Sequence, residues 1–333
     1  MLVARVRSRP AGERRSRRMS MRARPCARPA VILVAGASGF VGRALLAELR
    51  SGPTTRHVRA LVRREFDAVR LRQQNVDVVT GDLIARRGLD LAMRGVTTLV
   101  YLVHTLDRDG DVVANDLEAV QNALIAARAA GVRRVILLGS VGASEQSVSR
   151  YLLAQWAVEL AVRQSGLRWV VVRTPFIIGA GSTPFELMRR LVNRSPVVPL
   201  FRWRRTEVEP VALADVVEAL RIAIDEPEYD GRLFDMCGAD RTTLGRVVRE
   251  WGRVSGRRRL YVPLPGWGER VSSQLAWTLA RLPRRETTLQ LEALRERQVC
   301  PDPSLRFPLP HRPLGMRAAL AAVLEGARAA STP

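Results

Sequence analysis

The sequence predicts an α/β protein whose core is a doubly wound parallel sheet, followed by a smaller, mostly helical C-terminal region. Short apolar runs such as Val31–Ala35 (VILVA) recur along the chain, and strands buried on both faces of a parallel sheet have this composition. Helical segments alternate with these runs through short connections, as in a sheet built from βα units. With 333 residues, 47% of them hydrophobic, the chain can bury such a core.

Local patterns place the individual elements. Residues 99–103 (LVYLV) form a second continuous apolar run. Apolar residues from Val113 to Ala127 are spaced by four and three, which puts them on one face of a helix, and Gly131 is the expected C-terminal cap of that helix. Strands are expected at 31–35, 58–62, 76–79, 99–103, 135–138 and 169–172, and helices at 39–50, 113–127 and 151–164.

The net charge is +22, and every one of the 54 basic residues is an arginine. Ten of these arginines lie in the first 30 residues, beside a single acid. A strongly basic chain raises the question of nucleic-acid binding, but the remaining charge is scattered, so no nucleic-acid partner is predicted. No stretch of about 18 apolar residues is free of charges, so no membrane span is predicted.

The few cysteines and histidines lack the spacing of a metal site. Cys26, Cys237 and Cys300 form no CxxC pair, and the three histidines lie far apart in the sequence. We therefore expect no metal and no disulfide framework. Free cysteines in a chain without a signal peptide favour a reducing compartment, and the predicted location is the cytoplasm.

A glycine-rich turn follows the first predicted strand directly. It reads Gly36-Ala-Ser-Gly39-Phe-Val-Gly42 and opens a helix. In dinucleotide-binding loops one glycine permits the tight turn, the next lets the backbone approach the pyrophosphate, and the last lets helix and strand pack closely. The helix N-terminus then directs free N–H groups at the phosphates. The loop and its context predict a Rossmann-type dinucleotide site.

The chain resembles the short-chain dehydrogenase/reductase superfamily, and within it the atypical, NmrA-like NAD(P)-binding branch, whose members open with a loop similar to VAGASGFVG. Other matching segments are ALVRR at 60–64, GDL at 81–83, YLVHT at 101–105, LLGSVG at 137–142, RTPFIIGAGS at 173–182, PVALADVVEAL at 210–220 and GRLFDMCG at 231–238. The resemblance implies that Asp82 contacts the adenine amino group and that Leu83 lies beside the ring. The residues it implies for the cofactor site are Gly36, Ser38, Gly39, Phe40, Val41, Gly42, Arg63, Asp82, Leu83, Val103 and Thr174.

Three segments follow from these patterns. Residues 1–28 form a basic extension, rich in Arg and Pro, that is expected to be disordered. Residues 29–240 form the NAD(P)-binding Rossmann domain. Residues 241–333 form a helical region that covers the substrate site, with helices expected at 242–254, 267–281, 286–298 and 314–327.

The end of the second strand indicates which cofactor is bound. NAD-binding domains place an acid there to hold the ribose 2′-hydroxyl, whereas this chain has Arg63 and Arg64, and no acid before Glu65. A guanidinium suits a 2′-phosphate. Because the chain is so rich in arginine, arginines at these two positions could also be ordinary surface residues with no role in cofactor binding. NADP is the predicted cofactor, with NAD as the alternative.

The catalytic candidates are Ser140, Tyr151 and His104. Reductases of the superfamily use a Ser or Thr after the fifth strand and then Tyr-x-x-x-Lys on the next helix. Here Ser140 and Tyr151 fit the pattern, but Gln155 stands where the lysine is expected. A free tyrosine has a pKa of about 10 and needs a nearby cation to ionise near neutrality. The alternative for Tyr151 is therefore that it is an ordinary helix residue without a catalytic role. The alternative for His104 is that it is a polar residue at a strand end, hydrogen-bonded to a neighbouring loop.

The function predicted from these features is an NADP-dependent oxidoreductase that transfers hydride to a small-molecule substrate. The alternative is a non-catalytic NADP(H)-binding sensor or assembly factor, which Gln155 favours. A sugar-nucleotide epimerase or dehydratase ranks third because those enzymes also use Tyr and Lys, and a nucleic-acid binder ranks last.

Overall fold

The computed structural model of the chain describes residues 31–51, 56–264 and 284–329. The predicted disordered extension at 1–28 and the predicted helix at 267–281 lie outside these ranges. The division of the chain at residue 240 stays a prediction.

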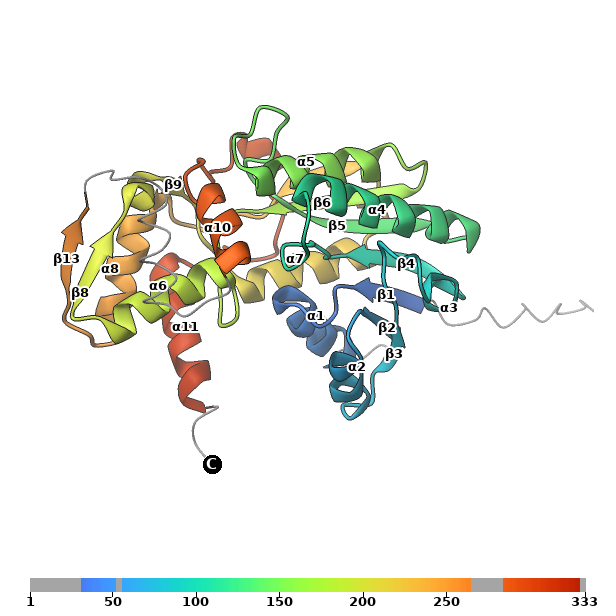
Figure 1. The fold of residues 1–333 in the computed structure, drawn as a ribbon, viewed down its shortest axis with the longest axis horizontal. Helices are drawn as coiled ribbons and strands as arrows, with labels where there is room; N and C mark the ends of the chain where they lie inside the picture. The colour runs from blue at the N-terminus through green and yellow to red at the C-terminus, as the bar shows by residue number, and fades with distance from the viewer. Residues whose placement is uncertain (1–30, 52–55, 265–283, 330–333) are drawn as a thin grey trace, which may run out of the picture.

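Seven parallel strands form the central sheet, in the order β11-β6-β5-β4-β1-β2-β3 (Figure 1). β1 lies between β2 and β4, so the chain winds outward from it in both directions. In sheets of this kind the ligand crevice lies at the carboxyl ends of the strands where the order reverses, here between β1 and β4. The strands are β1 (Val31–Ala35), β2 (His57–Val62), β3 (Asp77–Thr80), β4 (Val96–Tyr101), β5 (Arg134–Ser140), β6 (Arg168–Thr174) and β11 (Arg232–Asp235).

Helices cover both faces of the sheet and complete two apolar cores, which confirms the doubly wound prediction. Helix α4 begins where the Asp111 side chain accepts hydrogen bonds from the N–H groups of Val113 and Ala114. Gly131 follows its end with φ at 75°, as expected of a C-terminal cap. One face carries α1 (Phe40–Ser51), α2 (Glu65–Arg72) and α7 (Leu213–Asp225), and the other α3 (Leu89–Met93), α4 (Val112–Ala129) and α5 (Arg150–Arg163).

A second module has a core of its own around Phe185, Trp203 and Trp251. Figure 1 shows α8, β8 and β13 at the end of the molecule opposite β2 and β3. Helix α10 contacts both α5 and α6, so it lies near the carboxyl ends of the central strands. The module contains α6 (Thr183–Arg194), β8 (Val197–Leu200), α8 (Leu244–Val254), β13 (Leu260–Pro263), α10 (Arg284–Ala293) and α11 (Met316–Ala329).

Short elements join the two modules. The strands β7 and β10 pair in parallel, and β9 and β12 pair antiparallel. Their bounds are β7 (Ile177–Ile178), β9 (Glu207–Val208), β10 (Val211–Ala212) and β12 (Thr242–Thr243), and single 3₁₀ turns lie at Arg202–Arg205, Pro227–Tyr229 and Pro303–Leu305.

Cys237 and Cys300 form a disulfide, so the expectation of free cysteines is wrong for these two residues. Their Cα atoms lie 6.5 Å apart although 63 positions separate them in the sequence. The bond ties the chain just after β11 to the segment that follows α10. It also removes the reason for placing the chain in a reducing compartment.

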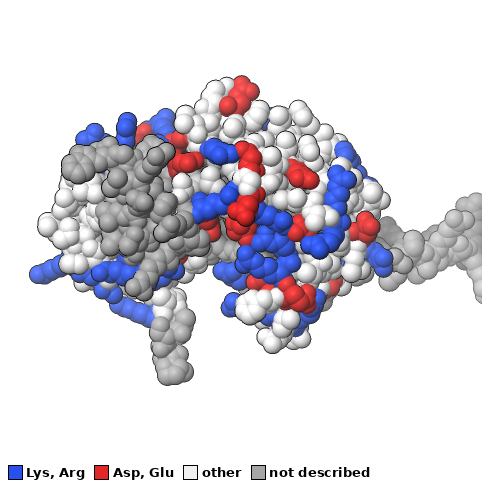
Figure 2. All heavy atoms as spheres, in the orientation of Figure 1, with Lys and Arg blue, Asp and Glu red and all other residues white. Residues whose placement is uncertain are grey.

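Many arginines of the described residues are held in ion pairs. Figure 2 shows acidic and basic side chains side by side across the middle of the visible face. Arg59 pairs with Asp77, and Arg173 pairs with the buried carboxylate of Glu159. No helix in the described ranges combines the length and the apolar composition that a bilayer crossing needs.

Candidate active site

The turn from β1 into α1 has room only for glycine at its first and last glycine positions, Gly36 and Gly42. Gly36 has φ of +86°, and a Cβ there would lie 3.0 Å from the carbonyl carbon of Leu102. A Cβ on Gly42 would lie 2.3 Å from the carbonyl oxygen of Gly36. The N–H of Gly39 donates to that same oxygen at 3.0 Å. The turn therefore brings bare backbone to the carboxyl end of β1, as a phosphate loop requires.

Two cavities meet at this loop and share Gly36, Gly39 and His104. The larger, of about 640 Å³, runs past the ends of β2 and β3, and the smaller, of about 290 Å³, lies over β5 and α5. Every residue predicted for the site lines one or both of them. Gly36, Ser38, Gly39, Arg63, Asp82, Leu83, Val103 and His104 line the larger, and Gly36, Gly39, Phe40, Val41, Gly42, Val103, His104, Ser140, Tyr151 and Thr174 the smaller.

Arg63 and Arg64 reach the same carboxylate at the far end of the larger cavity. An Nη2 atom of Arg63 lies 2.5 Å, and that of Arg64 2.8 Å, from Oδ2 of Asp107. Burial alone would raise the pKa of Asp107, but the hydrogen bond and charge of Arg63 and the charge of Arg64 outweigh it and hold this pKa below its usual range. Both guanidinium groups lie at the strand end where NADP-binding domains hold the 2′-phosphate.

Asp82 is held by its own turn and by an arginine. Its Oδ1 accepts hydrogen bonds from the N–H groups of Ile84 and Ala85, at 3.0 and 3.1 Å. Its Oδ2 pairs with Arg108. Burial would raise the pKa of Asp82, but the backbone bonds and Arg108 lower it below the usual value. The carboxylate stays ionised and lines the larger cavity beside Leu83.

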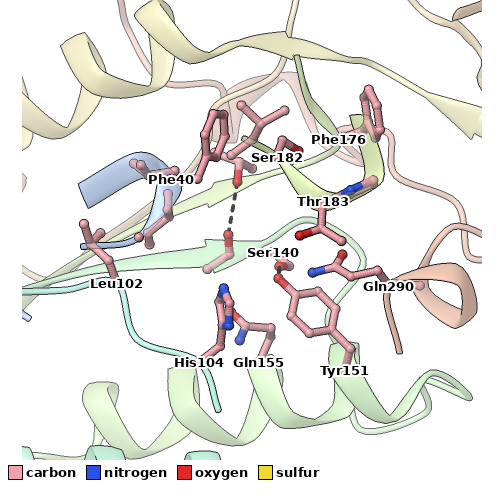
Figure 3. A pocket seen from close by; sticks show the side chains of 18 of the residues that line it. Phe40, Leu102, His104, Ser140, Tyr151, Gln155, Phe176, Ser182, Thr183 and Gln290 are labelled. Carbon is pink, nitrogen blue, oxygen red and sulfur yellow. Dashed lines mark hydrogen bonds between the residues drawn. The ribbon is translucent and has the colours of Figure 1, made fainter. Parts of the chain in front are cut away.

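The catalytic candidates meet in the smaller cavity (Figure 3). Ser140 ends β5 and Tyr151 lies in the first turn of α5, and their hydroxyl oxygens are 3.2 Å apart. The imidazole of His104 stands edge-on to the Tyr151 ring, with centroids 6.5 Å apart. Gln155 is buried one turn after Tyr151, on the same face of α5. These four side chains form one polar cluster beside the glycine loop.

The environment of Tyr151 keeps its hydroxyl protonated. Burial raises the pKa of Tyr151 above 10, the hydrogen bond with Ser140 opposes this rise, and the charge of Asp116 adds to it. At neutral pH the group is therefore a proton donor, placed where a substrate in the cavity would meet it.

The sequence predicted a helical region over the substrate site but not the residues that form one wall of the smaller cavity. This wall consists of residues from α6, α10 and the segment after α10, and a hydrogen bond from the Thr183 hydroxyl to Glu286 joins the first two. Nothing in a helical pattern more than 100 residues beyond β6 indicates which of its side chains face the crevice. The wall residues are Ser182, Thr183, Pro184, Glu286, Gln290, Ala293, Leu294 and Gln298.

The residues fit a bound dinucleotide. The glycines of the Gly36–Gly42 turn leave its backbone accessible, and helix α1 begins within the turn, at Phe40. A cavity leads from the turn to two arginines on one side and to the Ser140–Tyr151 pair on the other. Phosphates, ribose and a redox-active ring each have a place along this path.

Comparison with known proteins agrees with this reading. Residues 36–211 match the family described as "NAD(P)H-binding". A ceramide reductase of Caulobacter vibrioides is 35% identical over 253 residues, which cover 74% of this chain and 78% of that protein.

Solved structures share the fold. The triphenylmethane reductase of a Citrobacter species superposes with a TM-score of 0.70 at 19% identity, over 89% of this chain and 99% of that one. An NADPH-dependent quinone oxidoreductase of Escherichia coli, solved with NADPH, gives a TM-score of 0.69 at 17% identity, over 88% and 99% of the two chains. The resemblance read from the loop and the strand order is confirmed, and the chain belongs to the NAD(P)H-binding family.

Proposed function

We propose that this chain is an NADP-dependent reductase that transfers hydride to a carbonyl group of a small molecule. The observation that supports this most is the Ser140–Tyr151 pair, 3.2 Å apart, in a cavity that opens onto the glycine loop. A hydroxyl pair beside a nicotinamide site can bind a carbonyl oxygen and supply its proton.

The preference for NADP rests on charge at the end of β2. Arg63 and Arg64 line the larger cavity, and the carboxylate that both contact, Asp107, comes from another segment. A 2′-phosphate offers the same pair a doubly charged partner. NAD-binding domains place an acid at the end of this strand to hold the ribose 2′-hydroxyl, whereas here Arg63 and Arg64 follow β2 and no acid precedes Glu65.

The reductive direction follows from the protonation of Tyr151. Bound NADPH would supply the hydride. As the carbonyl oxygen gains charge, the hydroxyl of Tyr151 donates its proton to it, and Ser140 donates a second hydrogen bond to the same oxygen. Because burial and Asp116 raise the pKa of Tyr151, the site is better suited to giving a proton than to removing one.

The substrate class is inferred from the wall of the smaller cavity and from the ceramide reductase relative. The wall combines apolar side chains such as Ala293 and Leu294 with the amides of Gln290 and Gln298. Such a wall suits an amphiphile whose carbonyl lies next to amide or hydroxyl groups. We assign residues 241–333 the role of supplying the larger part of this wall. The first substrate to test is a ceramide-type lipid with a ketone in place of its secondary alcohol.

The proposal is tested by following NADPH consumption with purified full-length protein. A short-chain keto-ceramide and a simple quinone serve as substrates, and the corresponding ceramide serves as the control without a reducible carbonyl. Reduction of either carbonyl, with the alcohol product identified by mass spectrometry, supports the proposal. NADPH that binds but is not consumed with any carbonyl would contradict it.

A second candidate function, a protein that binds NADP(H) without turnover, is favoured by Gln155. This residue stands at the lysine position and cannot supply a charge to Tyr151. The two functions predict different rates of NADPH oxidation by the wild type. A binding protein should hold NADPH with equal affinity in the wild type and in Tyr151→Phe, and neither protein should oxidise it.

A further inference from the structure

Asp107, in the loop after β4, brings a carboxylate to the end of β2, where the residues that follow the strand supply none. Its Oδ2 lies 2.5 Å from Nη2 of Arg63 and 2.8 Å from Nη2 of Arg64, and its Oδ1 lies 3.4 Å from Nη1 of Arg63. All three side chains line the larger cavity. The two guanidinium groups that are expected to bind a 2′-phosphate therefore already hold an anion that belongs to the chain itself.

The backbone that carries Asp107 is anchored on both sides of this residue. The N–H of Thr105 donates to the buried carboxyl group of Asp116 at 2.6 Å. The N–H of Arg108 donates to the carbonyl oxygen of Thr105 at 2.9 Å, which closes a tight turn. The side chain of Leu106 lies inside an apolar cluster. The turn therefore holds Asp107 at the cavity, and only its side chain is free to move.

The ion pairs of Asp107 are exposed enough to be exchanged for a ligand. The side chains of Arg63, Arg64 and Asp107 are 35%, 64% and 41% exposed, and exposed ion pairs contribute little to stability. Burial favours the neutral acid, but the hydrogen bond and charge of Arg63 and the charge of Arg64 hold the pKa of Asp107 below its usual range, so the group is ionised at neutral pH. A 2′-phosphate must displace this carboxylate, whereas a ribose 2′-hydroxyl can donate a hydrogen bond to it.

We propose that Asp107 is a specificity-determining residue that narrows the preference of this chain for NADPH over NADH. Its carboxylate competes with the 2′-phosphate of NADPH for Arg63 and Arg64, and it accepts a hydrogen bond from the 2′-hydroxyl of NADH. The acid that NAD-binding domains carry at the end of the second strand is thus supplied here by the loop after β4. This inference rests on the dinucleotide binding in the proposed function.

Calorimetry on the full-length protein with NADPH and with NADH tests the proposal. Asp107→Asn keeps the size of the side chain and removes its charge. The affinity for NADPH should increase about 3- to 30-fold, because two exposed ion pairs no longer have to be broken. The affinity for NADH should fall about threefold, because an amide oxygen is a weaker acceptor than a carboxylate. An unchanged ratio of the two affinities would overturn the inference.

A neighbouring acid provides the matched control for charge. Asp109 lies two residues further along the same loop, is exposed and pairs with Arg285. Asp109→Asn makes the same change in net charge as Asp107→Asn and should leave both affinities as they are in the wild type. If Asp109→Asn raised the affinity for NADPH as much as Asp107→Asn, the effect would come from net charge, and the role of Asp107 would be overturned.

Two adenosine nucleotides show which part of the cofactor responds. Adenosine 2′,5′-bisphosphate and adenosine 5′-monophosphate differ only in the 2′-phosphate. Asp107→Asn should bind the first more tightly than the wild type does, and should not bind the second more tightly. A gain for both nucleotides would contradict competition at the 2′ position.

A double variant separates competition for the arginines from simple repulsion of the phosphate. In competition, the benefit of Asp107→Asn comes from freeing Arg63 and Arg64. Adding Asp107→Asn to Arg63→Ala should therefore raise the affinity for NADPH by a smaller factor than adding it to the wild type. An equal factor in the two backgrounds would show that Asp107 acts without Arg63, contrary to the proposal.

The outcomes distinguish this inference from the reductase function, because every measurement here is of binding. A wild type that binds NADPH and reduces no carbonyl would contradict the reductase function, and the affinities of Asp107→Asn would still decide the role of Asp107. An Asp107→Asn protein with the cofactor ratio of the wild type would overturn the role of Asp107 and leave the reductase function standing.

Discussion

The hydroxyl oxygens of Ser140 and Tyr151 lie 3.2 Å apart, at the junction of β5 and α5. The sequence separates the two residues by eleven positions, and the turn between them closes because Ser149 caps α5 by accepting from the N–H of Leu152. The pair is the proton-handling centre of the proposed reductase. The pair lacks the neighbouring cation of superfamily reductases, because neutral Gln155 stands one helical turn further along α5.

Gln155→Lys should increase turnover, because a cation one turn from Tyr151 favours the phenolate. Each unit by which the pKa of Tyr151 falls corresponds to about 1.4 kcal/mol, or tenfold in the proton equilibrium. Steady-state rates of the Gln155→Lys and Gln155→Met proteins measure this, since methionine has a similar length and no charge. Equal rates in the two variants would show that charge at this position does not matter.

Arg63→Ala should weaken NADPH binding and leave NADH binding almost unchanged. The hydrogen bond of a guanidinium to a charged group contributes about 1.5–3 kcal/mol, so the NADPH dissociation constant should rise about 10- to 150-fold. Calorimetry with both cofactors measures the difference. Arg133→Ala removes an exposed arginine just before β5, at the amino end of that strand and away from the carboxyl-end crevice, and controls for net charge. Equal NADPH and NADH affinities in the wild type would contradict the assignment.

The strand–helix alternation made the fold predictable. Runs such as Val31–Ala35 have no polar face, so they fit only a sheet covered on both sides, and the glycine spacing fixed which end carries the phosphates. Ser140 and Tyr151 were indicated by the resemblance to superfamily reductases, which place a Ser or Thr after the fifth strand and a Tyr on the next helix.

Other features depend on contacts between distant segments. Nothing near Cys237 in the sequence indicates that Cys300 lies against it, and Gln290 reaches the cavity only because α10 packs on α5 and α6. Asp116 did leave a signal, because a carboxyl stands four residues after Val112 on an apolar helix face. Periodicity shows that such a residue is buried but not which residues surround it.

The disulfide gives a stability prediction. Replacing Cys237 and Cys300 by serine should lower the free energy of unfolding by about 2–4 kcal/mol, because the bond closes a long loop and limits the unfolded chain. Urea unfolding with and without a thiol reductant measures this. The reductant should destabilise the wild type to the level of the double variant and leave the variant unaffected. A wild type with the same stability in both conditions would show that the bond does not contribute.

Asp235 gives a pH prediction. Burial raises the pKa of this carboxyl to about 6 against the charges of Arg173 and Arg306, and neither of its oxygens has a hydrogen-bond partner among the described residues. Between about pH 4 and pH 6 the folded state keeps a proton that the unfolded state has released, so this group's contribution to stability falls as the pH rises.

Asp235→Asn removes the pH-dependent contribution of this carboxyl to the free energy of unfolding. The stability of the variant relative to the wild type should therefore increase from pH 4 to pH 6 and level off above it, as urea unfolding at several pH values would show. Asp90→Asn, an exposed position on α3, should show no such trend. A difference between Asp235→Asn and the wild type that does not depend on pH would refute the assignment.

The most direct test of the reductase account is transfer of deuterium from NADPH labelled at C4 of the nicotinamide to a keto-ceramide. The wild type should place one deuterium on the former carbonyl carbon, detected in the product by mass spectrometry. Tyr151→Phe, which keeps the ring and loses the proton, should bind NADPH as tightly and form product about 10²–10⁴-fold more slowly. Deuterium absent from the product, or a Tyr151→Phe protein as fast as the wild type, would contradict the account.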